Sequence, residues 1–388
     1  MRSRRRSMRS MRGDVPRRVL MTADTVGGVW THALALIAAL GERGVRVALA
    51  TMGTPPSVAQ CAALARIPTA TLFASGCKLE WMSEPWEDVD AAGNWLLALE
   101  REWRPDVVHL NQFAFGALPF ASPKVVVAHS CVLSWWRAVH GEPAPAAWDR
   151  YRDAVTRGLA GADMVAAPTR AMLASVREHY GYAADAMVIA NAGDACAFVP
   201  GPKAPRVLAA GRLWDAAKNL AALEAVAPAL PWPVRVAGSF RHPEGGERVS
   251  RNVQGLGELE PRALAAELAQ ASIYALPARY EPFGLSALEA ALAGCALVLG
   301  DIASLREVWG DAALYVAPDD HGALQATLLR LIGDAALRQR LARAARARAL
   351  RLSPARMADR YVDAYRHAAR ARQAAARAAS DREHACAS

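Results

Sequence analysis

Two glutamates, Glu281 and Glu289, are the side chains in this sequence that are best placed to do chemistry. Glu281 follows the strand-like run 272–277, and Glu289 is the only carboxylate between residues 285 and 300, in an apolar segment with helical spacing. A charge in so apolar a helix is costly unless it is paired or bound. Both acids are therefore expected near the carboxyl end of a parallel strand, where open α/β sheets bind their ligands.

Two cations, Arg212 and Lys218, flank a predicted turn between a strand and a helix. A guanidinium forks onto phosphate oxygens and an ammonium adds a point charge, so the pair suits a diphosphate. Residues 283–286 open a helix whose free N–H groups would also attract phosphate. Carboxylates repel phosphate but accept hydrogen bonds from hydroxyls, so Glu281 and Glu289 suit the hydroxyl-rich groups around a diphosphate. The combination predicts a nucleotide-sugar site.

Each of these residues also has a simpler interpretation. The cations could be ordinary surface charges on a solvated turn, and the glutamates could form a helix cap or a surface salt bridge. A hydrolase that uses two carboxylates is a further alternative. The apolar helix around Glu289 and the nearby cations make that hydrolase less attractive.

The first half of the chain offers weaker signals at the ends of predicted strands. Gly27 and Gly28 follow the apolar run 18–23, where they would either let a backbone approach a ligand or simply make a tight turn. They do not form a G-x-G-x-x-G dinucleotide fingerprint. His109 and His129 each follow a β-branched run. A lone histidine is usually structural, but the position after a buried strand favours a functional role for His129.

Strand-like and helix-like segments alternate in both halves, and residues 198–205, with three prolines and a glycine, separate the halves. This pattern predicts an α/β fold of two Rossmann-like, doubly wound parallel sheets facing each other across a cleft. Residues 54–94 show no pattern from which helices or strands can be predicted. The predicted strands are 18–23, 45–51, 105–111, 124–128, 163–168, 187–190, 206–210, 234–237, 253–256, 272–277, 295–299 and 314–316, and the predicted helices are 30–42, 94–104, 148–160, 169–180, 261–270, 322–351 and 357–379.

Composition narrows the class of protein. Of the net charge of +9, residues 1–18 carry +7, since they hold eight arginines and one aspartate, which leaves +2 for the rest. So neutral a body does not suggest a nucleic-acid-binding protein. The tail, residues 1–16, is interpreted first as a disordered start, with weak attraction to an anionic membrane surface and a nucleic-acid arm as alternatives. It lacks the apolar core of a secretory signal.

The remaining composition points to a globular protein. Hydrophobic residues make up 53% of the chain, which permits large cores. No apolar run reaches the roughly 18 residues of a membrane span. The six cysteines form no CxxC motif and no cluster with zinc spacing, which favours a reducing cytoplasm and no structural metal.

Five segments, taken in order along the chain, resemble the retaining family-4 glycosyltransferases, which have the GT-B fold. An E-x7-E spacing alone is weak, but five ordered matches from about residue 19 to about residue 320, on a two-domain α/β pattern, are specific. Asn219 and Ala192 stand where that family often has glycine. The matches are Gly27-Gly28 with His32; Asn191, Gly193, Asp194, Phe198 and Pro200; Gly211-Arg212-Leu213 with Lys218-Asn219; Glu281 to Glu289; and residues 303–308.

The resemblance implies a role for each matched residue. Arg212 and Lys218 would bind the donor diphosphate and stabilise the charge on the leaving group, and Glu289 would hold the ribose. Glu281 would contact the donor sugar and His129 would lie near its reacting carbon, which completes the catalytic set. The other donor-binding groups would be the amides of Phe283, Gly284 and Leu285, the base-side residues Gly257 and Leu259, and Gly27 and Gly28.

The expected protein is therefore a cytoplasmic, retaining hexosyltransferase that uses a nucleotide-diphosphate sugar, with no cofactor, no metal and no nucleic-acid partner. Its acceptor, a glycan, a lipid-linked intermediate or a small molecule, stays open because the N-terminal half is matched less specifically. A GT-B-fold nucleotide-sugar epimerase and a non-catalytic sugar-nucleotide-binding protein are the alternatives. The expected parts are the tail 1–16, an acceptor-side domain 17–198, a nucleotide-sugar domain 199–352, and a C-terminal helix and frayed end 353–388 that cross back to the N-terminal domain.

Overall fold

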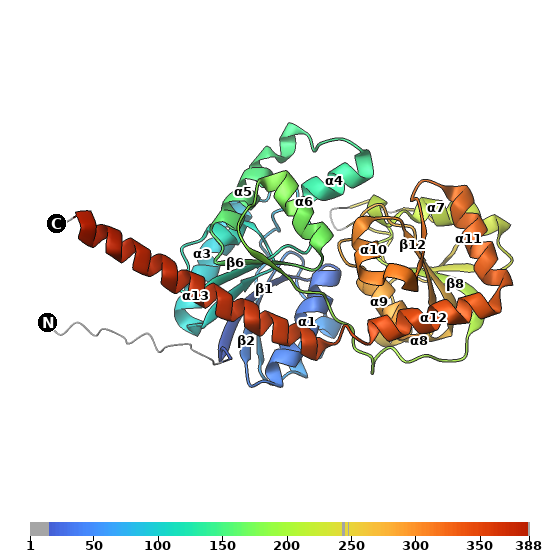
Figure 1. Cartoon of the computed structure of the whole chain (residues 1–388), viewed down its shortest axis with the longest axis horizontal. Coiled ribbons are helices and arrows are strands. Elements are labelled where there is room, and N and C mark those ends of the chain that lie inside the picture. Colours follow the sequence, from blue (N-terminus) through green and yellow to red (C-terminus); the bar gives the residue numbers. More distant parts are fainter. Residues whose placement is uncertain (1–14, 243–244, 247, 387–388) are drawn as a thin grey trace.

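The computed structural model describes residues 15–242, 245–246 and 248–386. Almost all of the basic tail 1–16, and with it the expectation of disorder or of membrane contact, lies outside these residues. Figure 1 shows two α/β domains and one long helix, α13 (Pro354–Cys386), that runs from the C-terminal domain across the N-terminal one. No helix in the described part of the chain combines the length and the apolar character that crossing a membrane requires.

Each domain is built on a parallel sheet, which confirms the predicted fold class. Within the described residues, the N-terminal sheet has the order β3-β2-β1-β4-β5-β6-β7 and the C-terminal sheet the order β10-β9-β8-β11-β12-β13. The strands are β1 (Arg18–Asp24), β2 (Arg46–Met52), β3 (Ala70–Ala74), β4 (Val107–Leu110), β5 (Lys124–Val127), β6 (Met164–Ala167), β7 (Ala186–Val188), β8 (Ala204–Ala210), β9 (Val234–Ala237), β10 (Gln254–Gly255), β11 (Ala271–Leu276), β12 (Ala296–Gly300) and β13 (Leu314–Val316).

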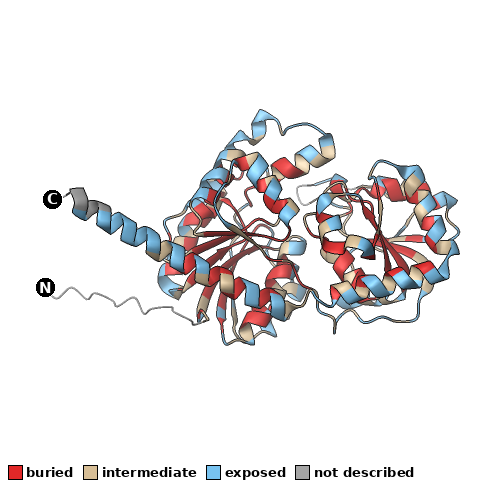
Figure 2. Ribbon diagram, in the orientation of Figure 1, coloured by how far each residue is buried: buried red, intermediate tan, exposed pale blue. Residues whose placement is uncertain are grey.

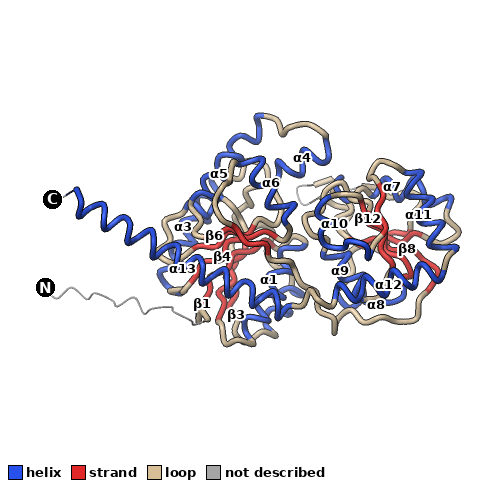
Figure 3. The backbone as a smooth tube through the Cα atoms, viewed as in Figure 1, coloured by secondary structure: helices blue, strands red, loops and turns tan. Residues whose placement is uncertain are grey.

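The strands form where the sequence has short apolar runs, because helices cover both faces of a parallel sheet and bury both sets of side chains. All of β11 and all of β12 are buried, and Figure 2 shows the buried ribbon concentrated in the two sheets. Figure 3 shows the covering helices. They are α1 (Gly28–Gly41), α2 (Val58–Ala65), α3 (Trp86–Trp103), α4 (Val132–His140), α5 (Asp149–Ala160), α6 (Arg170–Tyr180), α7 (Leu220–Val226), α8 (Pro261–Gln270), α9 (Leu285–Leu292), α10 (Ala303–Trp309), α11 (His321–Gly333) and α12 (Ala335–Ala349).

The structure corrects two helix predictions and adds helix α4. The helix expected over 322–351 is two helices, because Asp334 ends α11 and caps α12 by accepting the Leu337 N–H at 2.8 Å. The helix expected from residue 94 begins at Trp86 and includes Gly93, which packs closely, because a Cβ there would lie 3.2 Å from Leu118 Cδ2. Helix α4 was not predicted, although it follows the strand that ends before His129.

Helix α13 is part of the N-terminal core. Its apolar face repeats every three to four residues, as in Met357, Tyr361, Tyr365 and Ala368, and packs with residues of α1 and β1. The helix then continues beyond the domain as an exposed rod (Figure 1). The two segments that connect the domains also touch, because the Gly193 N–H donates to the Leu352 carbonyl at 3.0 Å.

Candidate active site at the domain interface

Loops at the carboxyl ends of the two sheets meet at the domain interface. Tyr280, after β11, accepts hydrogen bonds from Ser130 Oγ at 3.2 Å and from the Cys131 N–H at 3.1 Å, both after β5. Trp135 on α4 donates its indole N–H to Asp215 Oδ1 of the other domain over 2.9 Å. The loop that carries Glu281 and the loop that carries His129 are thus in contact at this interface.

Glu281 and Lys218 form an ion pair, with 2.7 Å between Oε2 and Nζ, although 63 residues separate them. Glu281 Oε1 accepts the N–H of Gly284 at 2.9 Å and that of Phe283 at 3.4 Å, at the start of α9. Burial would raise the pKa of Glu281, but the Lys218 charge and these hydrogen bonds hold it below its ordinary value. Glu281 is therefore an ionised carboxylate, and Lys218 is a cation for which a phosphate can compete.

Arg212 lies close to the N-terminal domain. Its guanidinium is 3.0 Å from Asp215 Oδ2 and 5.4 Å from the centroid of the Trp214 ring. A Cβ at Gly27 would lie 3.6 Å from Arg212 Cδ, and Gly27 has φ +80°, a backbone conformation that glycine adopts readily. The Arg212 side chain is 38% exposed, so its guanidinium can still reach a ligand.

Glu289 differs from Glu281 because it has no hydrogen-bond or ion-pair partner among the described residues. It lies on α9, between fully buried Leu288 and Ala290. Burial, with nothing to oppose it, raises the pKa of Glu289 to about 7. A partly covered acid without a partner is suited to a ligand that supplies hydroxyl donors.

The other predicted donor-side residues lie at two places. Gly28 begins α1, and a Cβ there would be 3.2 Å from Leu285 Cδ1, so the glycine turn of the N-terminal domain lies against the start of α9. Gly257 and Leu259 lie between β10 and α8, and the Gly257 carbonyl accepts the Gly238 N–H at 2.8 Å. Their contact with a nucleotide base remains a prediction.

His129 lies after β5, on the N-terminal side of the interface, and is partly exposed. Its Nε2 is 2.7 Å from Asn111 Oδ1. Burial, and to a lesser extent the neighbouring His109, lowers the pKa of His129 to about 3, so the ring is neutral near pH 7. Its position beside a donor sugar remains a prediction.

The sequence reasoning missed Asp24, the last residue of β1. Among the described residues its Oδ1 is buried without a hydrogen-bond partner, and burial raises the pKa of Asp24 to about 7 against the opposing charge of Arg212. Asp24 is thus close enough to Arg212 for their charges to interact across the interface. A signal was available in the sequence, because Asp24 directly follows the predicted strand 18–23. The same kind of position, directly after a predicted strand, favours a functional role for His129.

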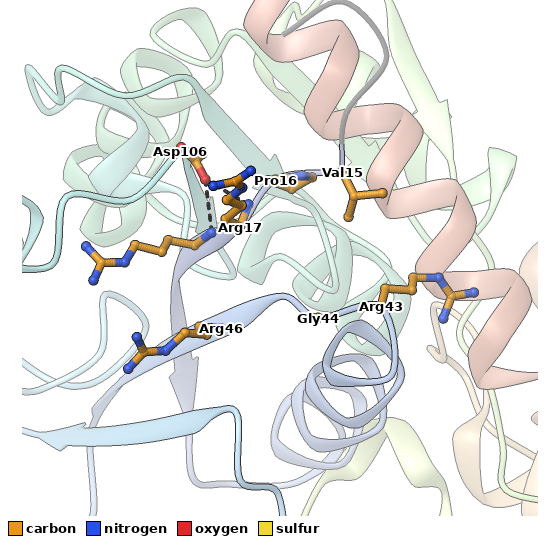
Figure 4. A pocket seen from close by; sticks show the side chains of 8 residues that line it. Val15, Pro16, Arg17, Arg43, Gly44, Arg46 and Asp106 are labelled. Atoms are coloured by element: carbon orange, nitrogen blue, oxygen red, sulfur yellow. Dashed lines mark hydrogen bonds between the residues drawn. The ribbon is translucent and has the colours of Figure 1, made fainter. Parts of the chain in front are cut away.

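A cavity of about 660 Å³ lies elsewhere, at the amino ends of β1 and β2, with four arginines in its lining (Figure 4). The Asp106 carboxylate at its edge already accepts the backbone N–H groups of Arg17 and Arg18, at 2.8 and 3.0 Å. Arg43 is paired with Asp359 at 2.6 Å. This cavity is at the opposite edge of the sheet from Gly27 and is not part of the candidate active site.

Each of the two domains matches a model of a glycosyltransferase family. The family model described as "Glycosyltransferase Family 4" matches residues 26–195, and that described as "Glycosyl transferases group 1" matches residues 204–334. A glycogen synthase of Mycobacterium tuberculosis is 32% identical over 273 residues, which cover 65% of this chain and 66% of the relative, just under two thirds of its length. O-antigen chain mannosyltransferase B of Escherichia coli is 37% identical over 84 residues, 22% of each chain.

Solved structures share the arrangement of the two domains. Sucrose-phosphate synthase from Thermosynechococcus elongatus has a TM-score of 0.76 at 19% identity, over 90% of this chain and 98% of that one. Anabaena Alr3699/HepE in complex with UDP-glucose has a TM-score of 0.70 at 17% identity, over 89% and 98%. At such identities the similarity establishes the GT-B fold and does not extend to the substrate.

Proposed function

We propose that this chain, which belongs to the GT-B glycosyltransferases through both of its domains, moves a hexose with retention from a nucleotide-diphosphate sugar to a hydroxyl acceptor. The observation that carries the proposal is the group at the start of α9. Lys218 pairs with an ionised Glu281 beside Arg212, while Glu289 on the same helix has no partner. Such a set suits a ligand that combines phosphates with hydroxyls.

In the proposed complex, Arg212 and Lys218 bind the diphosphate, and the N–H groups of the first turn of α9 add donors. Glu281 is then released in part from Lys218 and accepts a hydrogen bond from a hydroxyl of the sugar. Glu289 accepts hydrogen bonds from the ribose. The two cations are aimed at the oxygens on which negative charge develops as the diphosphate leaves, which stabilises the transition state.

In the proposed reaction, the bond between the anomeric carbon and the diphosphate oxygen breaks first and leaves a short-lived oxocarbenium-like sugar. The acceptor oxygen attacks the face from which the diphosphate departs, so the anomeric configuration is retained. The departing phosphate oxygen takes the proton of the acceptor hydroxyl. His129, neutral in this environment, acts near the reacting carbon through hydrogen bonding.

The donor is tested by thermal shift with UDP, GDP and ADP and their sugars. UDP-glucose is the first probe, because the similar Anabaena structure contains it. A nucleotide at 100 times its dissociation constant should stabilise the chain by about 2.7 kcal/mol. No shift with any of these compounds would contradict the proposed donor site.

Two alternatives give different products with the same donor. An epimerase would convert the donor sugar without an acceptor, so an isomerised nucleotide sugar in the product mixture would favour it. A binding protein would show the thermal shift without turnover. Product analysis by NMR separates all three, since transfer with retention yields a new glycosidic bond of the donor's own anomeric configuration.

The proposal also covers location and cofactors. We place the chain in the cytoplasm, with its basic tail, residues 1–16, in weak contact with an anionic membrane surface, and we expect no metal requirement. In the residues described above, no group of three or more His, Cys, Asp or Glu side chains is placed to hold a metal ion. Turnover should survive treatment with a chelator, and vesicle binding should fall when residues 2–14 are deleted.

A further inference from the structure

A chain of hydrogen bonds connects His129 to the C-terminal helix. Asn111 Oδ1 lies 2.7 Å from His129 Nε2 and 3.1 Å from His109 Nε2. His109 Nδ1 lies 2.9 Å from the hydroxyl oxygen of Tyr365, which is 256 residues away in the sequence. The chain thus runs from the end of β5, through β4 and the loop after it, to α13.

The direction of the Asn111 amide follows from its other partners. Asn111 Nδ2 is 2.6 Å from the carbonyl oxygen of Thr22, and the Asn111 backbone N–H donates to Thr22 Oγ1 at 2.9 Å. A carbonyl oxygen only accepts, so the amide nitrogen must face Thr22 and Oδ1 must face the two rings. An amide oxygen also only accepts. The Nε2 atoms of both His109 and His129 must therefore carry a hydrogen.

The surroundings of the two rings are aromatic. The centroid of His32 is 4.6 Å from that of His129, and the Tyr361 ring is 5.0 Å from His109. Burial lowers the pKa of His109 to about 4 and that of His32 well below its ordinary value. Neutral rings with a hydrogen on Nε2 have a lone pair on Nδ1.

The two lone pairs have different uses. On His109, Nδ1 accepts the hydroxyl of Tyr365. On His129, Nδ1 has no hydrogen-bond partner in the described chain, and this residue is partly exposed at the domain interface. The Nδ1 atom of His129 is therefore an acceptor available to a hydroxyl group.

We propose that Asn111, His109 and Tyr365 are positioning residues that hold His129 as its Nε2–H tautomer, so that Nδ1 accepts a hydrogen bond from a substrate hydroxyl. The inference rests on the proposed transferase function for its substrate. The hydrogen on Nε2 rests only on the geometry of Asn111, and the free Nδ1 lone pair rests in addition on the burial that keeps the ring neutral. Helix α13 thereby takes part in the site through Tyr365, which acts on His109 and not directly on His129.

The test is ¹⁵N NMR of the full chain with labelled histidine, in which the His129 signals are identified by their loss in His129→Gln. His109 and His129 should both show the neutral Nε2–H tautomer from about pH 6 to pH 8. In Asn111→Leu, His129 should populate both tautomers. The kcat of the Asn111→Leu variant should fall about 10- to 100-fold, as for other residues that orient a reacting ligand. The thermal shift that a nucleotide causes should stay unchanged.

Two further variants separate positioning from folding. Asn111→Asp keeps an oxygen acceptor for the rings and, when protonated on its other oxygen, can still donate to the Thr22 carbonyl, so it should retain the Nε2–H of His129 and preserve more activity than Asn111→Leu. Tyr365→Phe should alter the His109 signals and lower kcat by up to about tenfold. Tyr361→Phe is the matched control, because it removes a hydroxyl one turn earlier on α13 that makes no hydrogen bond to a histidine.

Several results would contradict the proposed tautomer of His129. A wild-type His129 that carries its hydrogen on Nδ1, or is an imidazolium at pH 7, overturns the inference, as do equal effects of Tyr365→Phe and Tyr361→Phe. Unchanged kcat in Asn111→Leu does the same. If the wild type turns over no donor, the proposed function fails, and the spectra of His129 alone then decide whether the tautomer is held.

Discussion

The two sides of the domain interface differ in how their ionisable side chains are stabilised. On the C-terminal side, ionised groups neutralise one another in pairs, Lys218 with Glu281 and Arg212 with Asp215. On the N-terminal side, burial opposes charge, so that the pKa of Asp24 rises to about 7 and that of His129 falls to about 3. A paired cation can exchange its partner for a phosphate, whereas the neutral His129 ring offers hydrogen bonds alone. The proposed complex uses this difference, with the charged part of the donor on the C-terminal side and hydroxyl groups on the other.

We expect the largest effect on turnover when Lys218 is removed from the C-terminal side of the interface. Lys218→Ala should lower turnover about 100- to 1,000-fold, because it removes transition-state stabilisation and leaves Glu281 partly buried without its partner. Glu281→Ala should act in the same direction. The measurement is kcat with the identified donor. Arg152→Ala, which removes an exposed cation paired with Asp149, is the control, and turnover of Lys218→Ala within about tenfold of wild type would exclude this pair from the reaction.

Glu289 is the exception on the charged side, since it is an acid without a partner. Its pKa is 4.5 when unfolded and about 7 when folded, so the folded state holds the proton more tightly. The free energy of unfolding should therefore fall as pH rises from about 4.5 to 7 and stay low above that. Glu289→Gln should abolish this loss, on the order of 3 kcal/mol, and should weaken nucleotide binding.

Urea unfolding at pH 5 and pH 8 measures the effect of Glu289→Gln. Glu142→Gln, at an exposed position, is the control for the change of net charge. The variant should gain stability over wild type at pH 8 and little at pH 5. An equal difference at both values would show that Glu289 does not titrate between them.

A smaller effect is expected where the two sides are joined. The indole N–H of Trp135 holds Asp215, which in turn holds Arg212. Trp135→Phe should raise the donor KM about three- to tenfold, the loss of one hydrogen bond, with less change in kcat. Trp136→Phe is the matched control, because the Trp136 indole nitrogen is buried and has no hydrogen-bond partner in the part of the chain that the structure describes. If both variants raise KM equally, the contact between Trp135 and Asp215 has no part in donor binding.

The sequence predicts the C-terminal side better than the N-terminal side, for a physical reason. Glu281, Lys218 and the start of α9 lie in short segments whose charges and glycines are visible as local patterns, and the strands that position them are apolar runs. The pairing of Glu281 with Lys218 was not foreseen, since the two were interpreted separately as ligands of sugar and phosphate.

The N-terminal side depends on contacts between distant residues. Tyr365 bonds to His109 across 256 positions and Trp135 to Asp215 across 80, and no spacing rule connects such pairs. Helix α4, which carries Trp135, is short. The glycine inside α3 weakens the helical pattern at the start of α3. Of the missed residues, Asp24 alone had a local signal, its place at the end of a buried strand.

Helix α13 has a consequence for synthesis of the chain. Residues of β1 and α1, which are synthesised before the C-terminal domain, share a core with Met357, Tyr361 and Tyr365. The domain made first therefore keeps an apolar face uncovered while the whole C-terminal domain is translated, and it is completed last. Such a face invites aggregation or chaperone binding in the interval. The N-terminal domain can therefore complete its core only after the C-terminal domain has been translated.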